Sequence, residues 1–154
     1  MSFDVHAPAE GLASRCEPIL RALPDWFGAE GAIEEYVARI DGLPTLMVTE
    51  DGADIGFLTL KLNGDRSADA YVLAVLGDRH RGGVGRAMFE AAEQWLLDRG
   101  VRFLQVKTVG ASHECSHYEK TRAFYAAIGF VELETFETMP DWPCPCLLMI
   151  KTID

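Results

Sequence analysis

The sequence predicts a mixed α/β (α+β) fold in which helices cover both faces of one sheet. Three observations predict this class. Segments of strand type alternate with segments of helical periodicity, residues 70–76 form an apolar run typical of a strand buried on both faces, and a Gly-rich turn joins that run to an amphipathic helix. Because 154 residues can bury one core, we expect a single domain over residues 1–154.

The first half of the chain should contain two helices followed by a strand pair. The expected helices are residues 12–23 and 31–40, and the expected strands are residues 45–49 and 55–62. Pro and Gly in the aromatic segment 24–28 predict a turn between the helices. The Asp51-Gly52 pair predicts a hairpin, so the two strands should be antiparallel.

The second half should add the central strand and its crossover. The expected elements are a strand at 70–76, a helix from Val84 to Gly100, a strand at 103–106, a helix at 119–128, and strands at 130–138 and 146–150. Strand, helix and strand over residues 70–106 should form a parallel pair, because the helix carries the chain back across the sheet. The complete order is not the repeating order of a dinucleotide fold, and it gives a mixed sheet.

Composition and charge exclude several kinds of partner. The net charge of −10 argues against nucleic acid and membrane surfaces, because binding them needs Lys and Arg clusters that are absent here. No apolar run is long enough for a membrane span and the first residues do not resemble an export signal, so we expect a cytoplasmic protein with four reduced cysteines. An acidic surface can attract a cationic amine, although solubility alone also explains the charge.

Metal ligand types occur in two short segments, but their spacing argues against a metal site. Residues 113–117 contain His, Glu and Cys, and Cys144 and Cys146 are separated by one residue. Zinc sites favour two or more residues between paired cysteines. We therefore expect no metal.

The most informative segment is the Gly-rich turn His80-Arg81-Gly82-Gly83-Val84-Gly85-Arg86-Ala87, between the apolar strand and the amphipathic helix. Free backbone N–H groups and the helix dipole favour an anion there, and glycines let a pyrophosphate approach the main chain. The turn matches neither a Walker loop nor a Rossmann fingerprint. By itself it is compatible with a phosphate cradle or with a tight connection that binds nothing.

In context, this turn resembles the central motif of the GNAT acetyltransferases. That motif is Gln or Arg, two residues, Gly, any residue, then Gly or Ala. The chain has His80, Gly83 and Gly85 at the three fixed positions, so His80 replaces the usual Gln or Arg. Backbone N–H groups do most of the binding in the family, so the replacement affects one side-chain contact.

A second motif lies downstream in the order that the family has. The late helix of GNAT enzymes ends in Phe-Tyr, three residues, then Gly-Phe, and residues 124–130 match this ending in full. Tyr118 stands where the family often has an Asn that contacts the cofactor. In element order the resemblance runs from about Val48 to the C-terminus.

The resemblance implies a GNAT-like fold with acetyl-CoA as co-substrate. The implied fold is a mostly antiparallel central sheet of six to seven strands, with a splayed parallel pair at its centre. In the family the turn binds the pyrophosphate, and the preceding strand holds the pantetheine and the thioester. The implied cofactor-binding residues are Leu73, Ala74, Val75, His80, Arg81, Gly82, Gly83, Val84, Gly85 and Arg86.

Acetyl transfer to an amine needs a base for the amine and an acid for the leaving thiolate. Tyr125 matches the family tyrosine that reaches the coenzyme A sulfur, and an ordinary tyrosine pKa of about 10 exceeds the roughly 8.5 of a thiol, so we expect it to be the acid. Many relatives carry a Glu base on this strand or the next, where this chain has Gln105. Asp69 is the nearest carboxylate, and it is either the base or a solvated strand end. A water chain would also serve as the base.

Aromatic residues are the candidates for the acceptor site. Trp26 and Phe27 lie in the early turn that covers the substrate side of GNAT folds, and Trp142 lies in the turn between the last strands. Sealing the core would explain Trp26 and Phe27 equally well.

The function that this resemblance implies is N-acetylation of a primary amine, with a small-molecule acceptor as the leading expectation. The alternatives are a protein acetyltransferase acting on an N-terminus or lysine, and a non-catalytic acyl-CoA-binding module. Because GNAT proteins often pair, the resemblance also suggests a homodimer.

Overall fold

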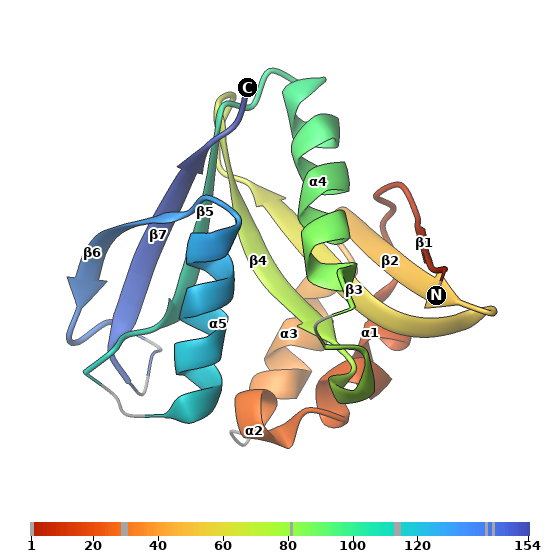
Figure 1. The fold of residues 1–154 in the computed structure, drawn as a ribbon, viewed down its shortest axis with the longest axis horizontal. Helices are drawn as coiled ribbons and strands as arrows, with labels where there is room; N and C mark the ends of the chain where they lie inside the picture. Colours follow the sequence, from red (N-terminus) through yellow and green to blue (C-terminus); the bar gives the residue numbers. More distant parts are fainter. Residues whose placement is uncertain (1, 29–30, 81, 113–114, 141, 143) are drawn as a thin grey trace.

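A seven-stranded mixed sheet forms the centre of the protein (Figure 1). The computed structural model describes all residues except 1, 29–30, 81, 113–114, 141 and 143. The strands are β1 (Asp4–Val5), β2 (Thr45–Glu50), β3 (Ala53–Leu62), β4 (Ser67–Val75), β5 (Phe103–Val109), β6 (Val131–Phe136) and β7 (Cys146–Thr152). The helices are α1 (Ala13–Arg21), α2 (Pro24–Phe27), α3 (Ala32–Ile40), α4 (Val84–Leu97) and α5 (Ser116–Ala127), with a short 3₁₀ helix η1 (Gly77–Arg79).

The strand order is β1-β2-β3-β4-β5-β7-β6, and β4 with β5 is the parallel pair. All other neighbouring strands are antiparallel. Helix α4 carries the chain from the end of β4 back to the start of β5, which makes the pair parallel. The expected mixed sheet with one central parallel pair is confirmed.

The parallel pair is a fork. β4 and β5 pair only from Ser67 with Phe103 to Asp69 with Gln105, and Figure 1 shows the two ribbons separating beyond that point. A register shift between Thr59 and Leu60 of β3 leaves Tyr71 of β4 as an extra residue, which bends a strand locally. The splay that the family resemblance implied is therefore present.

Helices lie on both faces of the sheet, as expected (Figure 1). Helices α4 and α5 pack on one face through a cluster that includes Met88, Phe89 and Tyr125. Helices α1 and α3 pack on the opposite face through a second cluster that includes Leu20 and Ile40. We call these the α4/α5 face and the α1/α3 face.

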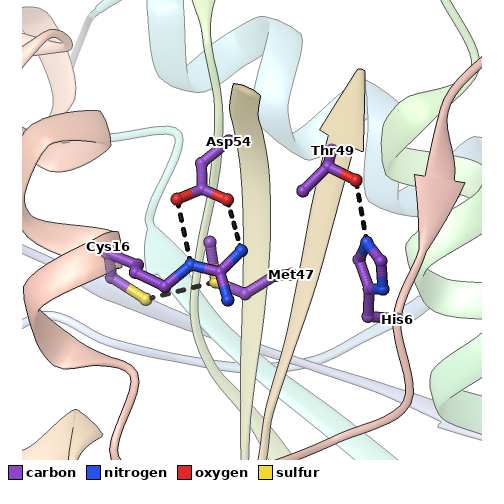
Figure 2. Close-up of polar contacts among 6 residues, drawn as sticks. His6, Cys16, Met47, Thr49 and Asp54 are labelled. Carbon is purple, nitrogen blue, oxygen red and sulfur yellow. Dashed lines mark hydrogen bonds and ion pairs between the residues drawn. The ribbon is translucent and has the colours of Figure 1, made fainter. Parts of the chain in front are cut away.

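Polar contacts join α1 and the N-terminal segment to the first strands (Figure 2). The thiol of Cys16 lies 3.8 Å from the sulfur of Met47 on β2. On the surface, the Arg15 guanidinium donates two hydrogen bonds to the carboxylate of Asp54 on β3. His6 and Thr49 are hydrogen-bonded at 2.8 Å, which fixes the short β1 segment against β2.

Several elements differ in extent from the sequence prediction. The aromatic segment between the first helices is the short helix α2 rather than a turn, because Pro24 occupies a first-turn position where its missing N–H costs nothing. β1 was not expected, since two residues carry no pattern. β4 begins at Ser67, three residues earlier than expected, so Asp69 is inside the strand.

None of the helices in the described part of the chain is both long and apolar enough to cross a membrane. Over the same residues, no three His, Cys, Asp or Glu side chains come together in a way that would hold a metal ion.

Candidate active site

The Gly-rich turn lies at the open end of the β4–β5 fork, between β4 and α4. Gly83 is the N-cap of α4 and has φ = +85°, a conformation that favours glycine. No described side chain caps α4, so the N–H groups of its first turn remain free for a ligand. A Cβ on Gly83 would meet no atom of the described residues within 4 Å, so none of them fills the space beside this backbone. The turn has the features of an anion site.

Side chains at the start of the turn and just before it hold its shape. His80 donates from Nε2 to the carbonyl oxygen of Val75 at 2.7 Å, which closes the turn onto the end of β4. Arg79 forms an ion pair with Glu50, with 2.6 Å between Nη2 of Arg79 and Oε1 of Glu50. Arg86 is exposed on the first turn of α4. Arg81 lies outside the described residues.

The backbone of Leu73, Ala74 and Val75 follows the fork. On one side these residues pair with β3, as far as Val75 with Gly56. On the other side the pairing with β5 has ended at Asp69. The edge of β4 that faces β5 therefore has no strand partner here, and it can bind an extended, amide-bearing chain as another strand would.

Gly85 has a packing role that the motif alone does not reveal. A Cβ on Gly85 would lie 2.8 Å from Cζ of Phe124 on α5, well inside contact distance. Phe124 in turn packs against Phe89 of α4, with 6.0 Å between ring centroids. Gly85 therefore lets α4 and α5 approach each other as well as leaving room at the turn.

Asp69 lies at the apex of the fork. Its side chain is only 9% exposed, and Oδ2 lies 3.7 Å from Nζ of Lys107 on β5. Oδ1 is buried and has no hydrogen-bond partner among the described residues. The alternative of a solvated strand end is wrong, because Asp69 is buried in the third position of β4. A buried carboxylate oxygen without a hydrogen-bond partner is uncommon in proteins, and it leaves Asp69 with an acceptor unused by the described residues.

Tyr125 is packed in the core between the helices and the sheet. It is 5% exposed, and its ring centroid lies 6.2 Å from that of Phe89 and 5.6 Å from that of Phe130. Burial raises the pKa of the Tyr125 hydroxyl well above its ordinary value, and the nearby Tyr36 and Tyr118 raise it further. The hydroxyl therefore keeps its proton at neutral and moderately alkaline pH. The role of Tyr125 as an acid stays a prediction.

Trp26 on α2 connects the two sides of the fork. Its Nε1 donates to Thr121 Oγ1 of α5 at 3.2 Å, and its carbonyl oxygen accepts from the hydroxyl of Tyr118 at 2.9 Å. The Trp26 ring also meets the ring of His80 edge-on, with 5.7 Å between centroids. Trp26 thus contacts both the Gly-rich turn and α5. Tyr118, which replaces the usual Asn of the family, holds α2 in place.

Phe27 continues this aromatic set, whereas Trp142 lies apart from it. Phe27 packs edge-to-face on Tyr36 of α3, and Tyr36 packs on Tyr71 of β4, with centroid distances of 5.9 and 5.8 Å. These rings form a wall on the α1/α3 face. For Trp142, the described residues give a backbone bridge to Met139 and no ring contact with Trp26 or Phe27.

A family model decides the identity of the domain. The model described as an acetyltransferase (GNAT) domain matches residues 41–132, which is more than half of the chain. The chain belongs to the GNAT acetyltransferase family. It is therefore an acyltransferase, and the resemblance of its two motifs to this family is confirmed.

Solved GNAT structures share the fold over the whole chain. A protein described as a GNAT-family acetyltransferase from Desulfovibrio desulfuricans has a TM-score of 0.85 at 16% identity, covering 99% of this chain and 100% of that one. The ribosomal-protein-S18-alanine N-acetyltransferase from Escherichia coli has a TM-score of 0.75 at 18% identity, covering 99% of this chain and 95% of that one. An aminoglycoside 6'-N-acetyltransferase complexed with coenzyme A has a TM-score of 0.73 at 17% identity, covering 100% of this chain and 98% of that one. At these identities the similarity shows the fold. A comparison with curated proteins gave no match.

Proposed function

We propose that this GNAT enzyme transfers an acetyl group from acetyl-CoA to the primary amine of a small molecule. The observation that carries the proposal is the fork itself. An uncapped helix start lies at its mouth, an unpaired strand edge runs along its side, and the buried carboxylate of Asp69 lies at its apex.

The residues of the fork fit acetyl-CoA. The free N–H groups at the start of α4, beside the space at Gly83 that no described residue fills, would hold the pyrophosphate. The edge of β4 from Leu73 to Val75 would pair with the amides of the pantetheine arm. When bound, acetyl-CoA supplies an activated acetyl group, whose carbon forms a bond to the amine nitrogen as its bond to sulfur breaks.

Two side chains handle the protons in this proposal. Asp69 accepts the proton of the acceptor ammonium, because its unpartnered Oδ1 is buried at the point where β4 and β5 separate. Tyr125 donates its hydroxyl proton to the sulfur that leaves, and the raised pKa keeps this proton available. Gln105, which pairs with Asp69 in the sheet, cannot take the part of the base.

The position of α2 favours a small acceptor over a protein. Trp26 is bound to Thr121 and Tyr118 of α5 and packs against His80, so α2 occupies part of the approach to the fork. A protein N-terminus or lysine would need a groove that stays open there. Phe27 and Tyr36 would contact the acceptor from the same side.

An acceptor screen tests the proposal. Release of free thiol from acetyl-CoA would be measured with small amines, amino acids and aminoglycosides, and with peptides that offer an N-terminus or a lysine. We expect turnover with a small amine and little with peptides. Turnover confined to peptides would replace the small-molecule acceptor with a protein. Tight binding of acetyl-CoA by calorimetry without turnover on any amine would indicate a non-catalytic acyl-CoA-binding module.

A further inference from the structure

A groove of about 330 Å³ opens on the α1/α3 face near the apex of the fork. Its lining residues come from the end of α3, the following loop, β3 and β4, and they are Arg39, Gly42, Leu43, Lys61 and Tyr71. Two of the five are cationic, although the chain has a net charge of −10. The groove is large enough for part of a small ligand.

Asp69 lies beside this groove and on the same face of the sheet. Ala68 and Ala70 pack in the cluster under α4, so Asp69 between them points to the opposite face. Tyr71, two residues further along β4, packs against the α1/α3 cluster. Lys61 is the direct cross-strand partner of Asp69. Directly opposite residues of antiparallel strands have Cβ atoms roughly 5 Å apart.

The groove has a negative charge on one side, at Asp69, and on the other, at Lys61, a positive charge without an ion-pair partner among the described residues. Asp69 is the buried carboxylate, with Oδ1 unpartnered and Lys107 near Oδ2. Lys61 is exposed and forms no ion pair within the described part of the chain. Arg39 lies 3.4 Å from Glu35, but both side chains are more than half exposed, so this pair is weak. Asp41, next to the groove, accepts a hydrogen bond from the backbone N–H of Ala13 at 2.9 Å.

We propose that the acceptor is an amino acid that binds across this pair of positions. Its ammonium group would bind the Asp69 carboxylate, and its own carboxylate would bind Lys61, with Arg39 at the far side of the groove. The wall formed by Tyr36 and Tyr71 would contact the side chain of the amino acid. The proposal rests on the acetyltransferase function proposed above and names the class of its acceptor.

The first readout is a comparison of free amino acids with their α-carboxamides in thiol release. The two members of each pair are nearly the same size and differ in the negative charge and in the basicity of the α-amine, so kcat/KM is compared for the neutral-amine fraction of each. The panel covers small, polar and apolar side chains. We expect kcat/KM to be at least about tenfold higher for the free acids, because a charge-assisted contact is lost in the amides. In Lys61→Gln this preference should fall toward one, whereas Lys61→Arg should retain most of it.

Arg99→Gln is the matched control. It removes the same charge from a residue beyond the end of α4, where the guanidinium lies over the Trp95 ring. α4 packs on the opposite face of the sheet, so the preference for free acids should be unchanged. An equal loss in Arg99→Gln and Lys61→Gln would show that net charge, and not the groove, sets the preference, and the proposal would be wrong.

The second readout does not depend on turnover. Binding of N-acetyl amino acids and of their carboxamides would be measured by calorimetry without acetyl-CoA. We expect the acids to bind and Lys61→Gln to lose that binding. If amines are acetylated but acids and amides react and bind equally, the amino-acid acceptor is overturned while the acetyltransferase function stands. If the acids bind through Lys61 but no amine releases thiol, the groove assignment stands and the proposed catalysis fails.

Discussion

At the scale of single residues, Tyr125→Phe isolates one hydroxyl. The ring contacts with Phe89 and Phe130 are kept, so thermal stability should change little. If the hydroxyl protonates the leaving thiolate, the turnover number should fall by roughly 10²-fold while affinity for acetyl-CoA is nearly unchanged. The chemical step should be measured in a single turnover, because slow product release would mask the effect.

The pKa of Tyr125 sets the expected pH dependence of this step. Burial raises it, so the hydroxyl stays protonated as the pH rises through the range where an ordinary tyrosine ionises. The wild-type rate should therefore show no alkaline loss below about pH 10, the ordinary tyrosine value. An unimpaired single-turnover rate in Tyr125→Phe would assign Tyr125 to the core alone.

Asp69→Asn tests the base at the apex of the fork. The change keeps the shape of the side chain but removes its capacity to accept a proton. The rate should fall most below the pKa of the acceptor amine, where deprotonation is needed, and should approach the wild-type rate above it. The measurement is kcat/KM against pH for both proteins. Two curves of the same shape and height would assign deprotonation to water.

At the scale of elements, the start of α4 offers a matched pair of glycines. Gly83 and Gly31 are both helix N-caps with φ near +80°, and a Cβ on either would meet no atom within 4 Å in the part of the chain that the structure describes. Valine at either position should cost about 1–2 kcal/mol of folding free energy, because the left-handed conformation is strained. Only Gly83→Val should also weaken acetyl-CoA binding, by at least about tenfold, since its side chain enters the anion site.

Calorimetry of both variants, with their melting temperatures, separates the two effects. Equal acetyl-CoA affinity in folded Gly83→Val and Gly31→Val would remove the pyrophosphate from the turn. Gly85→Val is a poorer probe, because its side chain would strike Phe124 and disturb the packing of α5 on α4.

The elements also show what sequence patterns can and cannot reveal. Periodicity and glycines predicted α4, α5, the central strand and the parallel pair, because these depend on local pattern. The length of the β4–β5 pairing and the proximity of Lys61 to Asp69 depend on strand register, which no local pattern encodes. The closeness of Gly85 to Phe124 and the hydrogen bond from Tyr118 to Trp26 of α2 form only when α5 packs against the rest of the fold.

At the scale of the whole molecule, the net charge of −10 and the local charge at the groove have opposite signs. The net charge acts at long range and would attract any cationic acceptor. The cations Lys61 and Arg39 act at short range, where they favour an acceptor that carries a carboxylate. A cationic amine and a zwitterionic amino acid should therefore respond differently to salt.

Raising the ionic strength should expose this difference. The Debye length shortens from about 30 Å at 0.01 M to about 8 Å at 0.15 M, so steering by the whole molecule is largely screened at the higher value. For a purely cationic amine we expect kcat/KM to fall severalfold over this range, because attraction by the acidic surface is lost. For an amino acid of zero net charge we expect little change, because no long-range attraction exists to be screened and the contacts with Asp69 and Lys61 are short.

The measurement is thiol release at several salt concentrations, with sodium chloride and potassium acetate compared to separate screening from anion binding at Lys61. If both acceptors lose rate equally, the acidic surface does not steer the acceptor and the charge of the chain serves solubility.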